Sequence, residues 1–112
     1  MIITILYDNN AHPGFESGWG FSCLVDGNQR ILFDTGDDGQ KLIHNFKKAN
    51  IDPKSVNKVV LSHNHWDHVD GLEGFRKFNS EAEVVHPNTF SELTEISSDI
   101  YSTGALGLFP KE

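Results

Sequence analysis

A run of metal-ligand side chains follows an apolar stretch in the sequence LSHNHWDHVDG, residues 61–71. His63, His65 and Asp67 alternate along the chain, and in an extended segment alternate side chains point to the same side. His68 breaks this alternation, and we expect it to return to the same cavity where the chain turns into a following helix. Imidazole and carboxylate groups together suit zinc, iron or manganese. The four residues therefore predict a site for a divalent transition metal.

These four ligands divide between two metal ions. His63 and His65 can hold one ion, while Asp67 and His68 hold its neighbour. Two ions about 3.5–4 Å apart make a bimetallic hydrolytic site. The alternative is ordinary solvated surface, which explains the density of polar residues but gives no reason for their spacing.

The elements that must position this motif alternate in type along the chain. Alternating and β-branched residues predict strands, and apolar residues at helical spacing predict amphipathic helices. Strands are expected at residues 1–7, 19–25, 30–33, 56–61 and 83–85, and helices at residues 40–49, 71–78 and 89–96. Early antiparallel strands followed by strand–helix alternation indicate an α/β (α+β) fold, a mixed sheet with helices on one face.

Length and composition limit the class of protein. With 112 residues, the whole chain is expected to form a single domain. The net charge of −7 and the lack of a Lys/Arg cluster exclude nucleic acid as an expected partner, because binding it relies on basic residues. The N-terminal apolar run is too short for a signal sequence or a membrane span, so we expect a soluble cytoplasmic protein without a membrane partner. Cys23 lies in an apolar run and is expected to be a buried, inert thiol.

Several motifs carry a family resemblance. HNHWDH at residues 63–68 resembles the HxHxDH signature of the metallo-β-lactamase superfamily. The preceding KVVLS, and FDTG at residues 33–36, resemble further motifs of that family in order and spacing. LYDN, GWGFSCLV and VVHP resemble more narrowly its branch of dihydropteroate- or ribofuranosylaminobenzene-phosphate-synthase-like hydrolases. The resemblance extends along nearly the whole chain.

The resemblance implies an αββα sandwich, two mixed sheets face to face with helices outside, of which this chain would form the N-terminal half as a truncated domain. His63 and His65 would hold the first ion, and Asp67 and His68 the second. Asp67 would also hold the attacking nucleophile in place, as the catalytic residue. Zinc is the expected ion, with iron or manganese as alternatives.

Two further residues receive roles from the resemblance. Asp34 would orient the metal-binding loops through hydrogen bonds. The alternative for Asp34 is a simple turn former after a strand. His86 would line the pocket without binding metal, with a ligand role as its alternative. Asp70 is expected to cap the helix that follows it.

The implied function is a metal-dependent hydrolase, in which a metal-activated water attacks an ester- or phosphoester-type small molecule. In the family a third His, a bridging Asp and a last His come from the second half of the domain. We therefore expect the site to need a second copy of the chain or a complementing C-terminal-half polypeptide. The alternative is a non-catalytic metal-binding module or an assembly-competent fragment.

Assembly is also expected from the sheet itself. IITILY, FSCLV and ILF carry alternating apolar residues toward the face without helices. Exposing such a face costs about 25 cal/mol per Å² of apolar surface. A two-fold homodimer in which the same patch meets itself would cover it.

Overall fold

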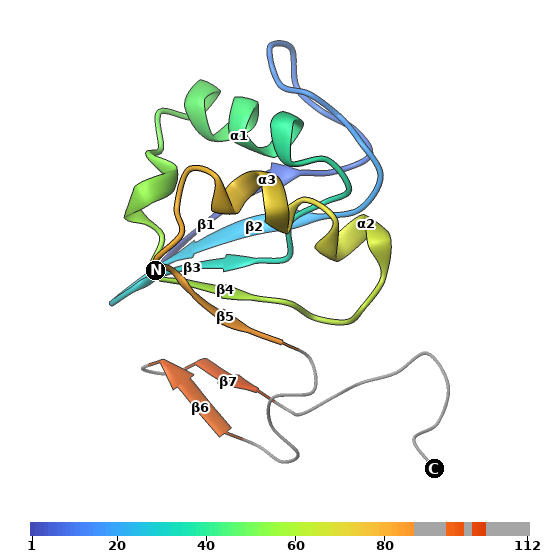
Figure 1. Ribbon diagram of the computed structural model, residues 1–112. Helices are drawn as coiled ribbons and strands as arrows, with labels where there is room; N and C mark the ends of the chain where they lie inside the picture. Colours follow the sequence, from blue (N-terminus) through green and yellow to red (C-terminus); the bar gives the residue numbers. More distant parts are fainter. Residues whose placement is uncertain (87–93, 98–99, 103–112) are drawn as a thin grey trace.

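The described part of the chain is built around a five-stranded mixed sheet (Figure 1). The computed structural model describes residues 1–86, 94–97 and 100–102, with side chains in the first of these ranges. The strand order is β1-β2-β3-β4-β5, with the bounds Ile2–Tyr7, Ser22–Asp26, Arg30–Phe33, Lys58–Val60 and Glu83–Val85. β1, β2 and β3 pair antiparallel, whereas β3, β4 and β5 are parallel. The mixed sheet predicted from the sequence is therefore confirmed.

Helices cover one face of this sheet (Figure 1). The helical elements are α1 at Gly39–Lys48, the 3-10 turn η1 at Pro53–Ser55, α2 at Trp66–Val69 and α3 at Leu72–Arg76. α1 begins at Asp38, whose side chain accepts hydrogen bonds from the amides of Gln40 and Lys41. Among the described helices, none is long and apolar enough to cross a membrane. The cytoplasmic location stays a prediction.

The hydrophobic core lies between the sheet and the helices. The strand register aligns Leu24, Leu32 and Val59 on the helix-covered face of three neighbouring strands. All three are buried in one cluster with Phe46 of α1 and Phe75 of α3. The two phenyl rings lie 5.8 Å apart, measured between their centroids. This packing holds α1 and α3 on the sheet, because each buried apolar side chain contributes about 1.5–3 kcal/mol.

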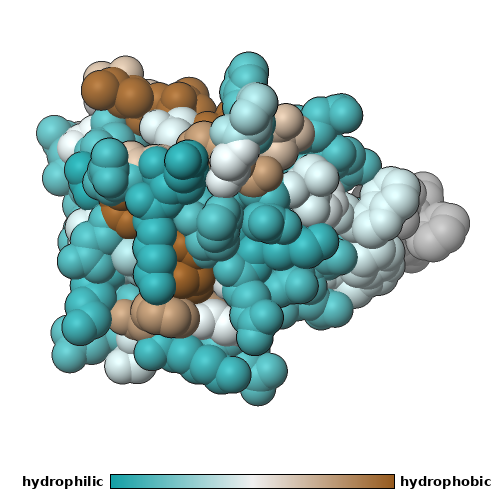
Figure 2. Space-filling view, turned by 90° about the horizontal axis from the view of Figure 1, so that it is seen from above, coloured by the Kyte–Doolittle hydropathy of each residue, from teal (hydrophilic) through white to brown (hydrophobic). Residues whose placement is uncertain are grey.

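The opposite face of the sheet also carries apolar side chains. The register places one row across this face: Ile5, Cys23, Phe33, Val60 and Val85. Cys23 is buried, as expected, but Ile3 and Ile5 of the edge strand β1 are 62% and 58% exposed. The surface over the helices, by contrast, is mostly hydrophilic, with hydrophobic residues in small areas (Figure 2). The homodimer expected to cover the open face stays a prediction.

The helix expected at residues 89–96 is wrong in its last part. Thr94–Ser97 forms strand β6, which pairs antiparallel with β7 at Ile100–Ser102. Thr94 and Ile96 are β-branched, which favours a strand over the helical spacing of the apolar residues. Residues 89–93 of the expected helix lie outside the described residues.

Candidate metal centre

The segment that carries the predicted ligands, residues 62–68, begins at the carboxyl-terminal edge of two neighbouring parallel strands. β3 ends at Phe33 and β4 ends at Val60, and these two residues are partners across the sheet. The chain leaves β3 through Asp34, whose amide donates to the carbonyl of Val60 at 2.9 Å. Parallel neighbours end at the same edge of a sheet, which is where sites of α/β proteins gather. The sheet therefore brings Asp34 to the segment that starts at Ser62.

Asp34 is a buried carboxylate that ties this segment together. Its side chain is 1% exposed, and its backbone has a φ of 61°. Oδ1 accepts a hydrogen bond from the Ser62 amide at 2.7 Å, and Oδ2 accepts one from the Ser62 hydroxyl at 2.6 Å. Nδ1 of His68 lies 2.8 Å from the same Oδ2. One carboxylate thus fixes both the start of the ligand run and its last histidine.

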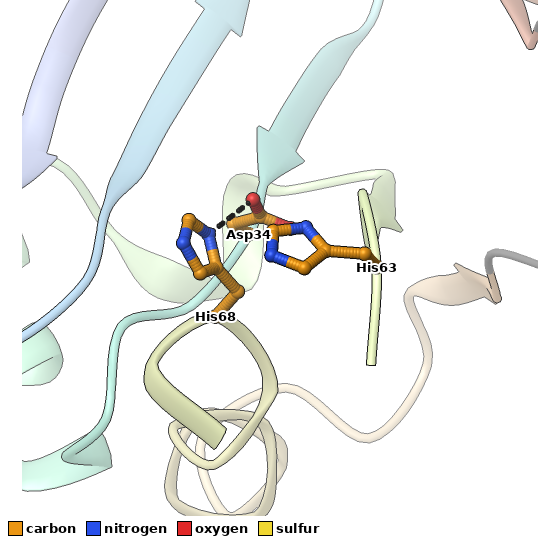
Figure 3. Close-up of side chains that lie close together, drawn as sticks. All are labelled: Asp34, His63 and His68. Carbon is orange, nitrogen blue, oxygen red and sulfur yellow. Dashed lines mark hydrogen bonds and ion pairs between the residues drawn. The ribbon is translucent and has the colours of Figure 1, made fainter. Parts of the chain in front are cut away.

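These bonds determine which ring nitrogens carry protons. A carboxylate accepts and does not donate, so Nδ1 of His68 must be the donor to Asp34. Ser62 gives its only hydroxyl proton to Asp34, so it accepts from Nδ1 of His63, which lies 2.7 Å from its oxygen. Both rings then carry a proton on Nδ1, so in the neutral form of each ring the lone pair lies on Nε2. Figure 3 shows the two rings side by side with Asp34.

The other two predicted ligands lie beside this pair. The His65 ring is 4.4 Å from the His63 ring, edge to face at 70°. The His68 ring is also 4.4 Å from the His63 ring, at 47°. Oδ1 of Asp67 lies 3.9 Å from Nε2 of His68. The structure therefore places His65 beside His63 and Asp67 beside His68, whereas the ligand atoms that gather most closely are those of Asp34, His63 and His68.

The way in which Asp67 arrives differs from the expectation. The extended segment expected from the sequence does not form, because the chain bends at His63 and Asn64 and residues Trp66–Val69 form the short helix α2. The amides of His68 and Val69 both donate to the carbonyl of His65, at 2.9 and 3.0 Å. The chain thus turns earlier than predicted, and Asp67 joins the group from a helix because short turns override side-chain alternation.

The loop after β3 also holds α2 through its backbone. The amide and the hydroxyl of Thr35 donate to the carbonyl of His68, at 2.8 and 2.9 Å. The amide of Gly71, just beyond α2, donates to the carbonyl of Gly36 at 3.0 Å. A Cβ added at Gly71 would lie 2.2 Å from the carbonyl oxygen of Thr35, so only glycine allows this approach. Sequence reasoning assigned no role to Thr35 or Ser62, although both lie inside quoted motifs, FDTG and KVVLS.

His86 and Asp70 are the other two residues with roles expected from the sequence. His86 follows β5 and is exposed. Asp70 ends α2 with the helical φ and ψ of −68° and −19°, and the N-cap residue of α3 is Gly71. The predicted capping role of Asp70 is therefore wrong, because Asp70 is the C-cap of α2 and the N-cap of α3 is the next residue.

The donor set fits a borderline transition metal. Burial lowers the pKa of His63, and the neighbouring His68 and His65 lower it further, against the weaker opposite effect of Asp34 and Asp67. The ring is therefore neutral at neutral pH, as a metal ligand must be. Within the described residues, ligand atoms of Asp34, His63 and His68 all lie within 4.8 Å of one another. Neutral imidazoles beside carboxylates are the donors that zinc, iron and manganese accept.

Comparison with known proteins agrees with this geometry. The family model of the metallo-beta-lactamase superfamily matches residues 20–108, which include the whole candidate site. The chain belongs to the metallo-β-lactamase superfamily. The HxHxDH resemblance found in the sequence is thereby confirmed.

Sequence relatives of the chain include a synthase and several ribonuclease Z enzymes. The chain is 37% identical over 102 residues to a 7,8-dihydropterin-6-methyl-4-(beta-D-ribofuranosyl)-aminobenzene-5'-phosphate synthase of Methanocaldococcus jannaschii, covering 87% of this chain and 35% of the synthase. It is 40% identical over 52 residues to a ribonuclease Z of Pediococcus pentosaceus, covering 46% of this chain and 16% of that enzyme. The first match confirms the similarity to the branch named from the sequence. The chain spans about a third of the length of the synthase and a smaller share of the length of other relatives.

Solved structures show the same fold. Tm1679, a metal-dependent hydrolase of the beta-lactamase superfamily, superposes with a TM-score of 0.63 at 27% identity, covering 88% of this chain and 46% of Tm1679. The Rm3 metallo-beta-lactamase superposes with a TM-score of 0.54 at 25% identity, covering 73% of this chain and 30% of Rm3. The metallo-β-lactamase fold expected from the sequence is confirmed for this part of the superfamily domain.

Proposed function

We propose that this protein provides the metal-binding part of a hydrolase that acts on an ester- or phosphoester-type small molecule. The observation that carries the proposal is the pair of histidines, His63 and His68. Nδ1 of His68 is bonded directly to the buried Asp34, and Nδ1 of His63 is bonded to it through Ser62, so both Nε2 atoms are left for a ligand. The relatives support it, because Tm1679 is a metal-dependent hydrolase and part of the chain also matches ribonuclease Z enzymes.

His63, His65, Asp67 and His68 would hold up to two divalent ions, most naturally zinc, with iron or manganese as alternatives. A bound ion of this kind supplies a water of lowered pKa and neutralises developing negative charge. Asp34 and Ser62 orient the two imidazoles toward it and keep them in the tautomer that binds.

Asp67 is the residue best placed to act on the attacking nucleophile. Its carboxylate lies beside the ring of His68, and its side chain is 29% exposed, so it reaches both the ligand group and solvent. A carboxylate in this position accepts a hydrogen bond from an incoming water and orients its lone pair toward the substrate. Its exposure leaves room for the small-molecule substrate to approach.

Completion of the site would come from outside the described residues. This chain spans 35% of the synthase and 46% of Tm1679, so those proteins have a further part that it does not match. A second copy of this chain, or a complementing polypeptide that matches that further part, would cover the open face of the sheet and add ligands. The exposed Ile3 and Ile5 support such a contact. A non-catalytic metal-binding module is the second candidate, because residues 63–68 supply the four predicted ligands from one segment.

Metal content and hydrolysis, measured together, test the proposal. The His63→Ala, His65→Ala double variant is expected to lose bound zinc or manganese that the native chain retains after dialysis. The matched control is the His12→Ala, His44→Ala double variant, because both residues are exposed and lie on other elements. Hydrolysis of bis(p-nitrophenyl) phosphate is expected to be weak for the chain alone and to rise with a complementing polypeptide. Equal, negligible metal in all three proteins would refute the proposal, and bound metal without any hydrolysis would favour the non-catalytic module.

A further inference from the structure

Gly20 lies against the backbone of α2, the short helix that carries Asp67 and His68. It has a φ of +102°, in the region that side chains other than glycine rarely adopt. A Cβ added there would lie 1.5 Å from the carbonyl oxygen of Asp67 and 2.5 Å from its carbonyl carbon. The tip of a flexible side chain could move out of the way, but these are backbone atoms of α2. No other residue can occupy position 20 while Asp67 stays where it is.

α2 has little stability of its own. It has four residues, none of them buried, and its N-cap residue His65 makes no capping hydrogen bond through its side chain. A helix this short does not form alone, because nucleation costs more than a single turn returns. Its position must therefore come from the segments that touch it. Thr35 holds it at the carbonyl of His68, and Gly20 touches it at the carbonyl of Asp67.

Gly20 is itself held in place. Its amide donates to Oδ1 of Asn9 at 3.1 Å. The next residue, Phe21, accepts a hydrogen bond through its carbonyl from the amide of Gly36, also at 3.1 Å. The Gly20 segment is thus bonded to the same loop that carries Asp34 and holds His68. The two loops, residues 20–21 and 34–36, together contact α2, and we call them its support.

We propose that Gly20 is a positioning residue of the metal centre, whose bare Cα sets where α2 sits and hence where Asp67 and His68 present their ligand atoms. The expected effect on metal binding rests on the proposed metal site, whereas the contact between Gly20 and α2 does not. A methyl group at position 20 displaces α2 from the support. His63 precedes α2 and keeps its bond to Ser62, so it stays in place while Asp67 and His68 move, and the ligand group is split.

Cobalt(II) titration of three alanine variants tests this proposal. Gly20→Ala is expected to bind cobalt at least about tenfold more weakly than the native chain and to change its visible absorption bands, which report ligand geometry. Gly14→Ala is the matched control for backbone strain, because Gly14 has a φ of +91° but an added Cβ meets only the flexible end of Lys48. Gly27→Ala is the control for the substitution itself, since its Cβ would meet only the Met1 side chain at 3.9 Å. Both controls are expected to bind like the native chain.

Amide hydrogen exchange without metal gives a second, independent readout. The Thr35 amide donates to the His68 carbonyl, so its exchange reports whether α2 rests on its support. It is expected to exchange at least about tenfold faster in Gly20→Ala, relative to core amides, and at the native rate in Gly14→Ala. If the native chain takes up no cobalt, the proposed function fails, and the Thr35 exchange alone decides the role of Gly20.

The remaining outcomes are also decisive. If Gly20→Ala does not fold, Asn9→Ala replaces it, because it removes the bond to the Gly20 amide without adding a side chain. Asn9→Ala is expected to weaken cobalt binding about threefold and to speed the Thr35 exchange. Native cobalt affinity and native exchange in Gly20→Ala, or in Asn9→Ala where it stands in, would overturn the proposal. So would equal losses in Gly20→Ala and Gly14→Ala.

Discussion

Asp34→Asn is expected to keep the fold and to weaken metal binding by changing the tautomer of His68. Asparagine has the same shape and tolerates a φ of 61°, so the backbone can stay in place. The Ser62 amide always needs an acceptor, whereas its hydroxyl and the imidazole can exchange donor and acceptor roles. The asparagine oxygen therefore faces the Ser62 amide, and its NH2 group faces Nδ1 of His68. Nδ1 must then accept, so the proton moves to Nε2 and blocks the lone pair that a metal needs.

The size of each effect follows from the bonds that change. Asp34 accepts three hydrogen bonds, at 2.7, 2.6 and 2.8 Å. Bonds to a charged acceptor contribute about 1.5–3 kcal/mol and neutral ones about 0.5–1.5 kcal/mol. Because asparagine can still satisfy all three partners, the free energy of unfolding is expected to fall by only about 1–3 kcal/mol. Metal affinity is expected to fall about 10–100-fold, as for other residues that orient metal ligands.

Urea unfolding and zinc titration of the same preparation separate the two effects. Asp38→Asn is the matched control, because it removes a nearby charge while asparagine still caps α1. It is expected to change neither the metal affinity nor the His68 ring. Nitrogen-15 chemical shifts of the imidazoles identify the protonated nitrogen directly. Native zinc affinity in a folded Asp34→Asn chain, with Nε2 of His68 still unprotonated, would refute the tautomer argument.

Three further predictions concern the body of the domain. Burial, and then the hydrogen bond to Asp37, raise the pKa of Tyr7, so the folded state favours the neutral phenol. The free energy of unfolding, measured in urea, should therefore fall above about pH 10. Tyr7→Phe should remove that fall and should lower the free energy of unfolding by about 1–3 kcal/mol at pH 7. Burial, then the charge of Asp34, raises the pKa of the Cys23 thiol, so a disulfide reagent at pH 8 should react with it far more slowly in the folded chain than in urea. Sedimentation should show a dimer that dissociates in Ile5→Lys but not in Ile2→Lys, since these exposed residues lie on opposite faces of β1; equal behaviour of the two variants would contradict packing through the open face.

The grouping of the candidate ligands could be predicted from the sequence because they lie in one short segment. The side-chain alternation expected of His63 and His65 is not what brings their rings together, since the chain bends at His63 and Asn64. Asp67 and His68 required only that the chain turn, although the turn at Trp66 comes earlier than expected. The strands and α1 were equally accessible, because their apolar periodicity agrees with their burial.

The support of the site could not be predicted in the same way. Ser62 and Thr35 act through partners 28 and 33 residues away in the sequence, and Gly20 through a contact with Asp67. Nothing in a serine, a threonine or a glycine distinguishes such a role from an ordinary loop position. The parallel pairing of β3 with β4 creates these contacts, and only the fold reveals it. The last part of the helix expected at residues 89–96 was wrong for a related reason, since pairing of β6 with β7 overrode local spacing at residues 94–96.

Asp34 shows why two interpretations of one residue need not compete. As a turn former it must adopt a φ of 61°, which glycine, asparagine and aspartate tolerate best. As the anchor of Ser62 and His68 it must accept three hydrogen bonds without donating any, which only a carboxylate can do. Glycine meets the first demand alone, glutamate the second alone, and asparagine places a donor where an acceptor is needed. Aspartate is the only residue that satisfies both, so the turn and the orientation of the metal ligands are one requirement on one side chain.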